Sequence, residues 1–184
     1  PDAKLFEFQT VPDLTLSMVS DKIDAAIFNN ASLTEILRNY DEIGILQRDI
    51  IKNPIGTGFN KNNPDLRAQF NTFLAEIKSN GILADMEDRW VKKLSLEMPP
   101  ITGSDKNGVL KVGIDKNMGM PFAFVHNGNL AGMDIELAER FAAWLGKSLE
   151  PVDLVFSSML AALKTNKIDM AACCMTITEE RQKE

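Results

Sequence analysis

The stretch Lys167–Arg181, KIDMAACCMTITEER, joins a short apolar run to a polar cluster. An earlier stretch, Lys22–Ile36, KIDAAIFNNASLTEI, follows the same plan: Lys-Ile-Asp, then small apolar residues, then a polar cluster with Thr-Glu. An apolar run of this length before a helix start is typical of a buried strand in an α/β sheet. Ligands of open α/β sheets bind beyond the carboxyl ends of the strands, where the chain turns into the next helix. The later polar cluster is therefore a candidate ligand-binding turn.

This polar cluster, which follows Met175, contains two threonine hydroxyls and a guanidinium. Thr178 can cap a helix that Glu179 begins, and the first N–H groups of a helix favour an anion. Arg181 adds a planar fork of donors that matches a carboxylate in bidentate fashion. We expect this cluster, together with Thr176, to hold the acid group of a small ligand. The alternative is a solvated surface arginine beside two glutamates.

The composition is that of a globular chain with an acidic balance. Of the 184 residues, 45% are hydrophobic and 25% are charged, which is enough apolar material for a core and one or two globular units. The net charge of -6 argues against nucleic acid as a partner, because nucleic-acid affinity depends on clustered Lys and Arg. No apolar run approaches the ~20 residues that cross a bilayer.

The cysteines and the histidine do not suggest a metal centre. Cys173 and Cys174 are neighbours in a predicted strand, where they point to opposite faces and serve as small apolar residues. His126 is the only histidine and precedes Asn127-Gly128, a dipeptide typical of tight hairpin turns. A zinc site on the two cysteines would lack its usual ligand set, so we expect no metal and no cofactor.

Short strands alternate with helices along the chain, which predicts an α/β fold with a parallel or mixed sheet. In the first part we expect strands over residues 4–8, 23–28 and 42–47, and helices over residues 12–20 and 32–38.

The sequence pattern changes at Pro64. A helix is expected to begin there after its cap Asn63 and to end at Gly81. A second helix carries Trp90. Residues 94–108, with two prolines, two glycines and no periodicity, have the composition of a connection between units. Beyond this connection we expect a strand, VLKVGI, then a hairpin, a helix over residues 134–145, a further strand, a short helix and the strand of the opening quotation.

Residues 108–184 resemble the first lobe of a family 3 extracellular solute-binding protein, the amino-acid receptors of ABC importers. The motifs that carry this resemblance are GMDIELA and TITEER. Residues 1–93, with GFNKNNPDLR, resemble the closing half of the same family. The resemblance implies periplasmic-binding-protein type II lobes (the Venus flytrap fold), present here as partial modules.

The two halves stand in the reverse of the order expected in one receptor. We therefore interpret residues 1–93 as the closing half of a first module, with a hinge near 55–59, residues 94–108 as a linker, and residues 109–184 as the first lobe of a second module. A circular permutant is the alternative. If the modules are tandem, the helices over residues 64–93 should pack little against residues 109–184, leaving four side chains exposed: Phe70, Phe73, Leu74 and Trp90.

The resemblance also implies a set of ligand-binding residues. By position, Arg181 matches the residue that pairs with the α-carboxylate of the ligand, with Thr176 as a supporting donor. Asp115 matches an acidic residue that contacts the ligand, and Phe156 matches an aromatic wall. Asn29 stands where the family usually has an aspartate for the α-ammonium group.

Two of the matched positions depart from the family pattern. Asn29 lacks the full charge of an aspartate, so it would hold an ammonium group less strongly. Cys174 stands where the family usually has glycine, close to the ligand, so its side chain is expected to crowd the pocket.

The functional expectation is a two-lobed clamp that closes on an amino acid or related carboxylate outside the cytoplasm, in the periplasm or at the cell surface. An ABC permease or another membrane partner would recognise the closed form. We expect binding without catalysis. One alternative is the ligand-sensing input domain of a membrane sensor kinase. The other is a dehydratase or cell-wall enzyme on the same scaffold, for which only Asp115 is a plausible proton-transfer group.

Overall fold

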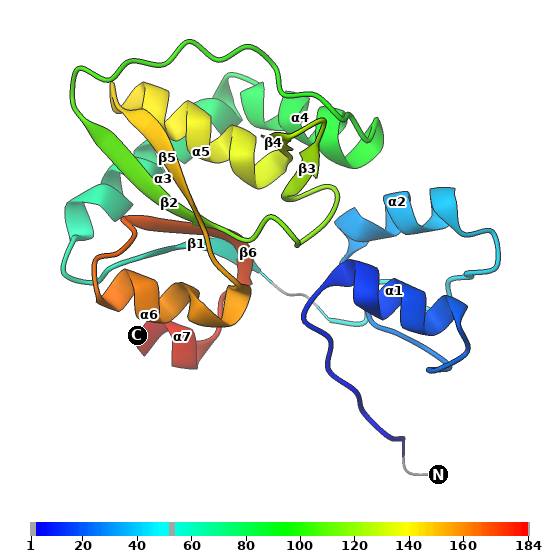
Figure 1. Cartoon of the computed structure of the whole chain (residues 1–184). Coiled ribbons are helices and arrows are strands. Elements are labelled where there is room, and N and C mark those ends of the chain that lie inside the picture. The colour runs from blue at the N-terminus through cyan, green and yellow to red at the C-terminus, as the bar shows by residue number, and fades with distance from the viewer. Residues whose placement is uncertain (1–2, 52–53, 184) are drawn as a thin grey trace.

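The computed structural model of the chain describes residues 3–51 and 54–183. Its main part is a four-stranded mixed sheet in the order β1-β6-β2-β5 (Figure 1). The central strand β2 runs parallel to β5 and β6, and β1 pairs antiparallel with the far side of β6. The strand bounds are β1 Ile55–Phe59, β2 Val109–Ile114, β5 Ser148–Asp153 and β6 Met170–Thr176.

Strand β6 is the apolar run of the opening quotation, and both of its faces are covered. Met170 and Ala172 belong to one hydrophobic cluster, whereas Ala171 and Cys173 belong to another. This split follows the two-residue period of a strand, whose successive side chains point to opposite faces. Residues buried on both faces read as a continuous apolar run, which confirms the α/β prediction for this segment.

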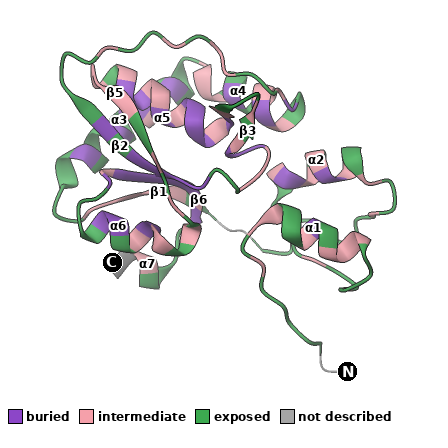
Figure 2. Cartoon of the chain, viewed as in Figure 1, coloured by how far each residue is buried: buried purple, intermediate pink, exposed green. Residues whose placement is uncertain are grey.

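Helices cover the two faces of the sheet (Figure 1). The larger cluster lies under α3, α4, a π-helical turn and α5, and the smaller one under a 3₁₀ turn and α6. The buried residues gather between these layers (Figure 2). The bounds are α3 Pro64–Ser79, α4 Ile82–Glu87, the π-helical turn Asp88–Lys92, α5 Met133–Trp144, the 3₁₀ turn Phe156–Ser158, α6 Met159–Lys164 and α7 Glu179–Lys183.

The sequence signals for turns and caps hold in this part of the chain. Asn63 accepts a hydrogen bond from the backbone of Leu66 and caps α3. A two-stranded hairpin, β3 Phe124–His126 and β4 Asn129–Ala131, turns at Asn127 and Gly128. Both turn residues have positive φ, which is the conformation that Asn-Gly turns favour.

The expected separation of residues 64–93 from residues 109–184 is wrong. Phe70, Phe73 and Trp90 are at most 4% exposed, and Leu74 is partly buried against the same cluster. The rings of Phe70 and Phe73 lie 5.0 and 5.2 Å from that of Phe141 on α5. The apolar stripe of α3 finds a complementary face on α5, and the connection over residues 94–108 runs over the top of the lobe (Figure 1). Residues 54–93 and 109–183 thus build one lobe.

A buried ion network joins the same two segments. Glu136 of α5 is 0% exposed and accepts hydrogen bonds from Arg89 at 2.8 Å to both carboxylate oxygens, from the indole N–H of Trp90 at 2.6 Å and from Arg140 at 2.8 Å. Two of these donors come from the π-helical turn before the connection. The contact between the segments is therefore specific as well as apolar.

Cutting the connection should leave the two segments associated. With a protease site inserted between Gly103 and Ser104, we expect the two fragments to elute together in gel filtration and to separate only in denaturant. The reason is that the apolar cluster and the Glu136 network both cross between the fragments. Separate elution of the cut fragments under native conditions would contradict the one-lobe assignment.

The N-terminal region, residues 3–51, contains two helices and extended segments. The helices are α1 Val11–Val19 and α2 Asn30–Asn39, close to the predicted helices. The strands predicted over residues 4–8, 23–28 and 42–47 are wrong: these segments have no ladder partner within the described chain. Side chains there, such as Leu5 and Leu46, stay 90% and 92% exposed. A strand needs a neighbour to complete its hydrogen bonds, and the described chain supplies none here. Throughout the described residues, no helix combines the length and the apolar character needed to span a membrane.

Candidate functional site

The carboxyl ends of β2 and β6 bring four of the predicted site residues onto one edge of the lobe. Asp115 follows β2, Thr176 ends β6, Phe156 begins the 3₁₀ turn after β5, and Arg181 lies in α7. Hydrogen bonds or ring contacts link all four, as the next paragraphs describe. Residues that are up to 66 positions apart in the sequence therefore form one cluster.

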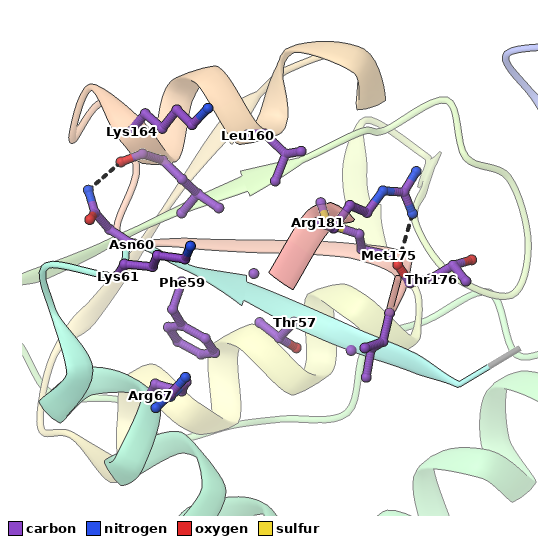
Figure 3. A pocket seen from close by; sticks show the side chains of 14 residues that line it. Thr57, Phe59, Asn60, Lys61, Arg67, Leu160, Lys164, Met175, Thr176 and Arg181 are labelled. Atoms are coloured by element: carbon purple, nitrogen blue, oxygen red, sulfur yellow. Dashed lines mark hydrogen bonds between the residues drawn. The ribbon is translucent and has the colours of Figure 1, made fainter. Parts of the chain in front are cut away.

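Arg181 is held from two sides at this edge. Its Nη1 donates a hydrogen bond to the backbone carbonyl of Thr176 at 2.9 Å (Figure 3). Its Cζ lies 5.3 Å from the ring centroid of Phe156, within the range of a cation–π contact. The other guanidinium donors have no acceptor among the residues that the structure describes. The guanidinium is thus oriented by one hydrogen bond and one ring contact, and its other N–H groups are left to bind an incoming carboxylate.

Thr178 forms the predicted cap of the last helix. Its Oγ1 accepts a hydrogen bond from the backbone N–H of Arg181 at 3.2 Å. This bond places Arg181 in the first turn after β6, where its side chain can fold back to Thr176. The motif TITEER therefore sets the position of the guanidinium through local backbone geometry.

Asp115 is 5% exposed, and both of its carboxylate oxygens accept backbone hydrogen bonds. Oδ1 accepts from the N–H of Asn117 and Oδ2 from the N–H of Phe156, each at 3.0 Å. A carboxylate with these two donors has less capacity for a ligand cation. The structure thus places Asp115 within the cluster but facing the protein backbone.

Cys174 occupies a strained position in β6. Its φ is +48°, and it lies where the register between β1 and β6 shifts, between the pairs Gly58–Ala171 and Gly56–Met175. A non-glycine residue in the left-handed region costs about 1–2 kcal/mol. Burial raises the pKa of the Cys174 thiol well above its usual range, and the Asp134 carboxylate and Cys173 raise it further. Cys174 is therefore a protonated thiol rather than a nucleophile.

The neighbouring thiol is also protonated at neutral pH. Burial raises the pKa of Cys173 to about 12; the carboxylates of Asp134 and Asp115 add to the rise and the guanidinium of Arg181 opposes it. Within the described residues, no group of three His, Cys, Asp or Glu side chains could hold a metal ion.

Asn29 lies outside the lobe that carries the other candidates. It caps α2, and its Oδ1 accepts the backbone N–H of Ser32 at 2.8 Å. This bond uses the amide oxygen that was expected to receive an ammonium group. Its role as a ligand residue stays a prediction.

A cavity of about 430 Å³ extends from Arg181 along β1 and α6 (Figure 3). Four cationic residues and no acidic ones are among its lining residues: Lys61, Arg67, Lys164 and Arg181. Sequence reasoning missed this cavity, because its walls come from segments about a hundred residues apart. The motif GFNKNNPDLR, which supplies Lys61 and Arg67, was the available signal.

Comparison with known proteins identifies the segment that carries this cluster. Residues 110–184 match the sequence model of the bacterial extracellular solute-binding proteins, family 3. The matched residues are less than half of the chain, and the match gives the family that this segment is similar to. The match begins within β2, ends after α7 and includes all four residues of the cluster: Asp115, Phe156, Thr176 and Arg181.

Two proteins that are similar to this segment are named as amino-acid-binding proteins. The arginine-binding extracellular protein ArtP of Bacillus subtilis is 38% identical over 64 residues, which are 35% of this chain and 25% of that protein. A probable histidine-binding protein of Campylobacter jejuni is 40% identical over 73 residues, 40% of this chain and 28% of that protein. The solved arginine-bound form of domain 1 from TmArgBP is 45% identical, with a TM-score of 0.40, covering 42% of this chain and 61% of that one. The chain thus spans about a quarter of the length of these two curated relatives.

Proposed function

We propose that the lobe binds a small amino acid through its carboxylate. The observation that carries this proposal is the guanidinium of Arg181, held by the Thr176 carbonyl and the Phe156 ring while its remaining donors have no acceptor within the described chain. A planar fork held in this way is suited to a bidentate pair with a carboxylate. The names of the curated relatives support amino acids, with arginine and histidine as the first probes.

The wider role follows from the family. We propose that the protein captures its ligand outside the cytoplasm for an ABC-type importer, that a second lobe closes over the ligand, and that a permease recognises the closed form. We also propose binding without catalysis. Two observations support this: the Asp115 oxygens are engaged by backbone N–H groups, and burial raises the pKa of Cys173 to about 12.

The organisation of the chain is also a proposal. We propose that residues 1–93 correspond to the closing half of a receptor, that residues 94–108 are a linker, and that the last helices of the closing half pack on the first-lobe segment, residues 109–184. The burial of Phe70, Phe73 and Trp90 in one cluster with that lobe supports a permuted single lobe over the junction of two tandem modules.

A direct test is titration of the chain with L-arginine and L-histidine, followed by calorimetry and by the shift in melting temperature. A ligand that binds only the folded state raises the melting temperature. If neither L-arginine nor L-histidine gives a binding heat or raises the melting temperature, the result would count against amino-acid binding.

Arg181→Lys should weaken binding of L-arginine by about tenfold or more, because lysine keeps the charge but loses the planar fork. The dissociation constant from calorimetry measures the effect. Arg38→Lys, at an exposed position on α2, is the matched control and should bind as the unmodified chain does. An unchanged dissociation constant in Arg181→Lys would remove Arg181 from carboxylate recognition.

A further inference from the structure

Asp115 is the acidic residue of the cluster, and its surroundings differ from those of a ligand-facing carboxylate. It is 5% exposed, and its two oxygens each accept a backbone N–H. One of these donors, Asn117, lies two residues ahead and shapes the loop after β2. The other, Phe156, lies 41 residues away and starts the 3₁₀ turn after β5.

The bond to Phe156 fixes where the chain leaves β5. The ladder between β2 and β5 ends with Ile114 opposite Asp153, and the Leu154 N–H donates to the Ile114 carbonyl at 3.0 Å. The next link across the two strand ends is the Asp115 side chain on the Phe156 N–H. Asp115 therefore continues the pairing of the two strands by a side-chain bond and sets the backbone position from which the Phe156 ring projects.

The Phe156 ring in turn faces the guanidinium of Arg181. The cation lies 5.3 Å from the ring centroid, and the only hydrogen bond of the guanidinium within the described chain is to Thr176. Removal of the ring contact would leave a single bond to orient a long, flexible side chain. The orientation of the Arg181 guanidinium thus depends on the position of Phe156.

We propose that Asp115 is a positioning residue that acts on carboxylate recognition through Phe156 and Arg181, and that it does not contact the ligand itself. This inference rests on the proposed function, because it concerns the same site. It assigns Asp115 a different role from the ligand contact that the family resemblance implied. It also means that the charge on the side chain of the ligand is not read by Asp115.

The binding test compares three probes that differ in one group each. L-Arginine and L-citrulline share the α-carboxylate, but citrulline has no side-chain charge; L-argininamide keeps the charge and lacks the carboxylate. Asp115→Asn should weaken the binding of L-arginine and of L-citrulline by a similar factor, about tenfold if the bidentate pair is lost. It should change the affinity for L-argininamide by less than about twofold. A larger loss for arginine than for citrulline, or an equal loss for argininamide, would show direct contact and overturn the proposal.

Coupling between the residues gives a second readout. In a chain that already carries Phe156→Leu, Asp115→Asn should have little further effect on arginine affinity, because the path through the ring is gone. Additive losses in the double variant would overturn the proposal. Asp153→Asn is the matched control: this carboxylate also ends a strand on the same edge, but it pairs with Lys116 and not with the Phe156 backbone.

A ligand-free measurement separates this proposal from the proposed function. In ¹⁵N-labelled protein, the Nε–H signal of Arg181 should carry a ring-current shift from Phe156, and Phe156→Leu gives its unshifted position. Asp115→Asn should move the signal toward that position and speed exchange of the Phe156 amide, whereas Asp153→Asn should do neither. An unmoved signal in Asp115→Asn overturns the positioning role. If no probe binds the unmodified chain, the proposed function fails, and the spectra still decide the role of Asp115.

Discussion

Asp134→Asn is expected to increase the free energy of unfolding more at pH 8 than at pH 4. The difference between the two effects is about 4 kcal/mol. Asp134 lies in the first turn of α5, is 8% exposed, and its Oδ2 is buried without a hydrogen-bond partner in the described chain. Burial raises the pKa of this carboxyl from 3.8 to about 7. The positive end of α5 favours the ionised form, but loss of hydration dominates.

The sign follows from which state holds the proton. Between pH 3.8 and about 7 the unfolded chain has released the Asp134 proton, while the folded chain keeps it. Stability therefore falls as pH rises through this window and levels off above the folded-state pKa. Asparagine cannot ionise, so the variant avoids this loss. Any fixed cost of the amide group is the same at every pH and cancels in the comparison.

Urea denaturation of both proteins at several pH values measures the effect. Asp105→Asn, which removes a charge from the exposed connection, controls for the change in net charge. Parallel stability curves for the unmodified chain and Asp134→Asn between pH 4 and 8 would show that Asp134 ionises as readily in the folded state as in the unfolded one.

Glu136→Gln should lower the free energy of unfolding by about 3–5 kcal/mol, the usual cost of breaking a buried ion pair from one side. The substitution keeps the shape of the side chain but removes the charge that Arg89 and Arg140 share. The side chains of these two arginines are only 27% and 24% exposed, so water cannot fully replace the lost partner. The indole N–H of Trp90, at 2.6 Å, competes for the one remaining oxygen.

A second glutamate provides a matched control. Glu76 also accepts an indole N–H, from Trp144 at 3.0 Å, but both side chains are exposed. Glu76→Gln should therefore cost less than about 1 kcal/mol, because water replaces the lost bond. Urea denaturation of the two variants at one pH gives the comparison. Equal effects would mean that the Glu136 network contributes no more than a surface hydrogen bond.

The local elements of the lobe could be predicted because their signals are complete within a few residues. Asn63 and Pro64 mark the start of α3, Asn127-Gly128 marks the hairpin, and Thr178 caps the helix that carries Arg181. The motifs of this segment predicted a resemblance to the family 3 solute-binding proteins, and residues 110–184 match the model of that family. In α3, the hairpin turn and the last helix, the hydrogen bonds that define the element come from its own or adjacent residues.

The role of each candidate could not be predicted in the same way. The sequence gives no sign that Oδ2 of the Asp115 carboxylate has a hydrogen-bond partner, because the donor, the N–H of Phe156, is 41 residues away. The acceptor oxygen of Asn29 is occupied by the cap of α2. Ligand-binding capacity depends on which groups are already bonded, and those bonds come from distant segments.

The sequence by itself determined the helices, the tight turn, the apolar β6 strand and the TITEER motif that ends it. Helices complete their hydrogen bonds internally, and turns depend on the φ preferences of single residues, so both can be read locally. Only the tertiary structure decided that residues 4–8, 23–28 and 42–47 form no ladder. It also decided that Phe70, Phe73 and Trp90 pack in one cluster with residues of β2, α5 and β6. Strand pairing and burial depend on which distant surface lies within reach, and an amphipathic helix specifies that it needs an apolar partner without specifying which one.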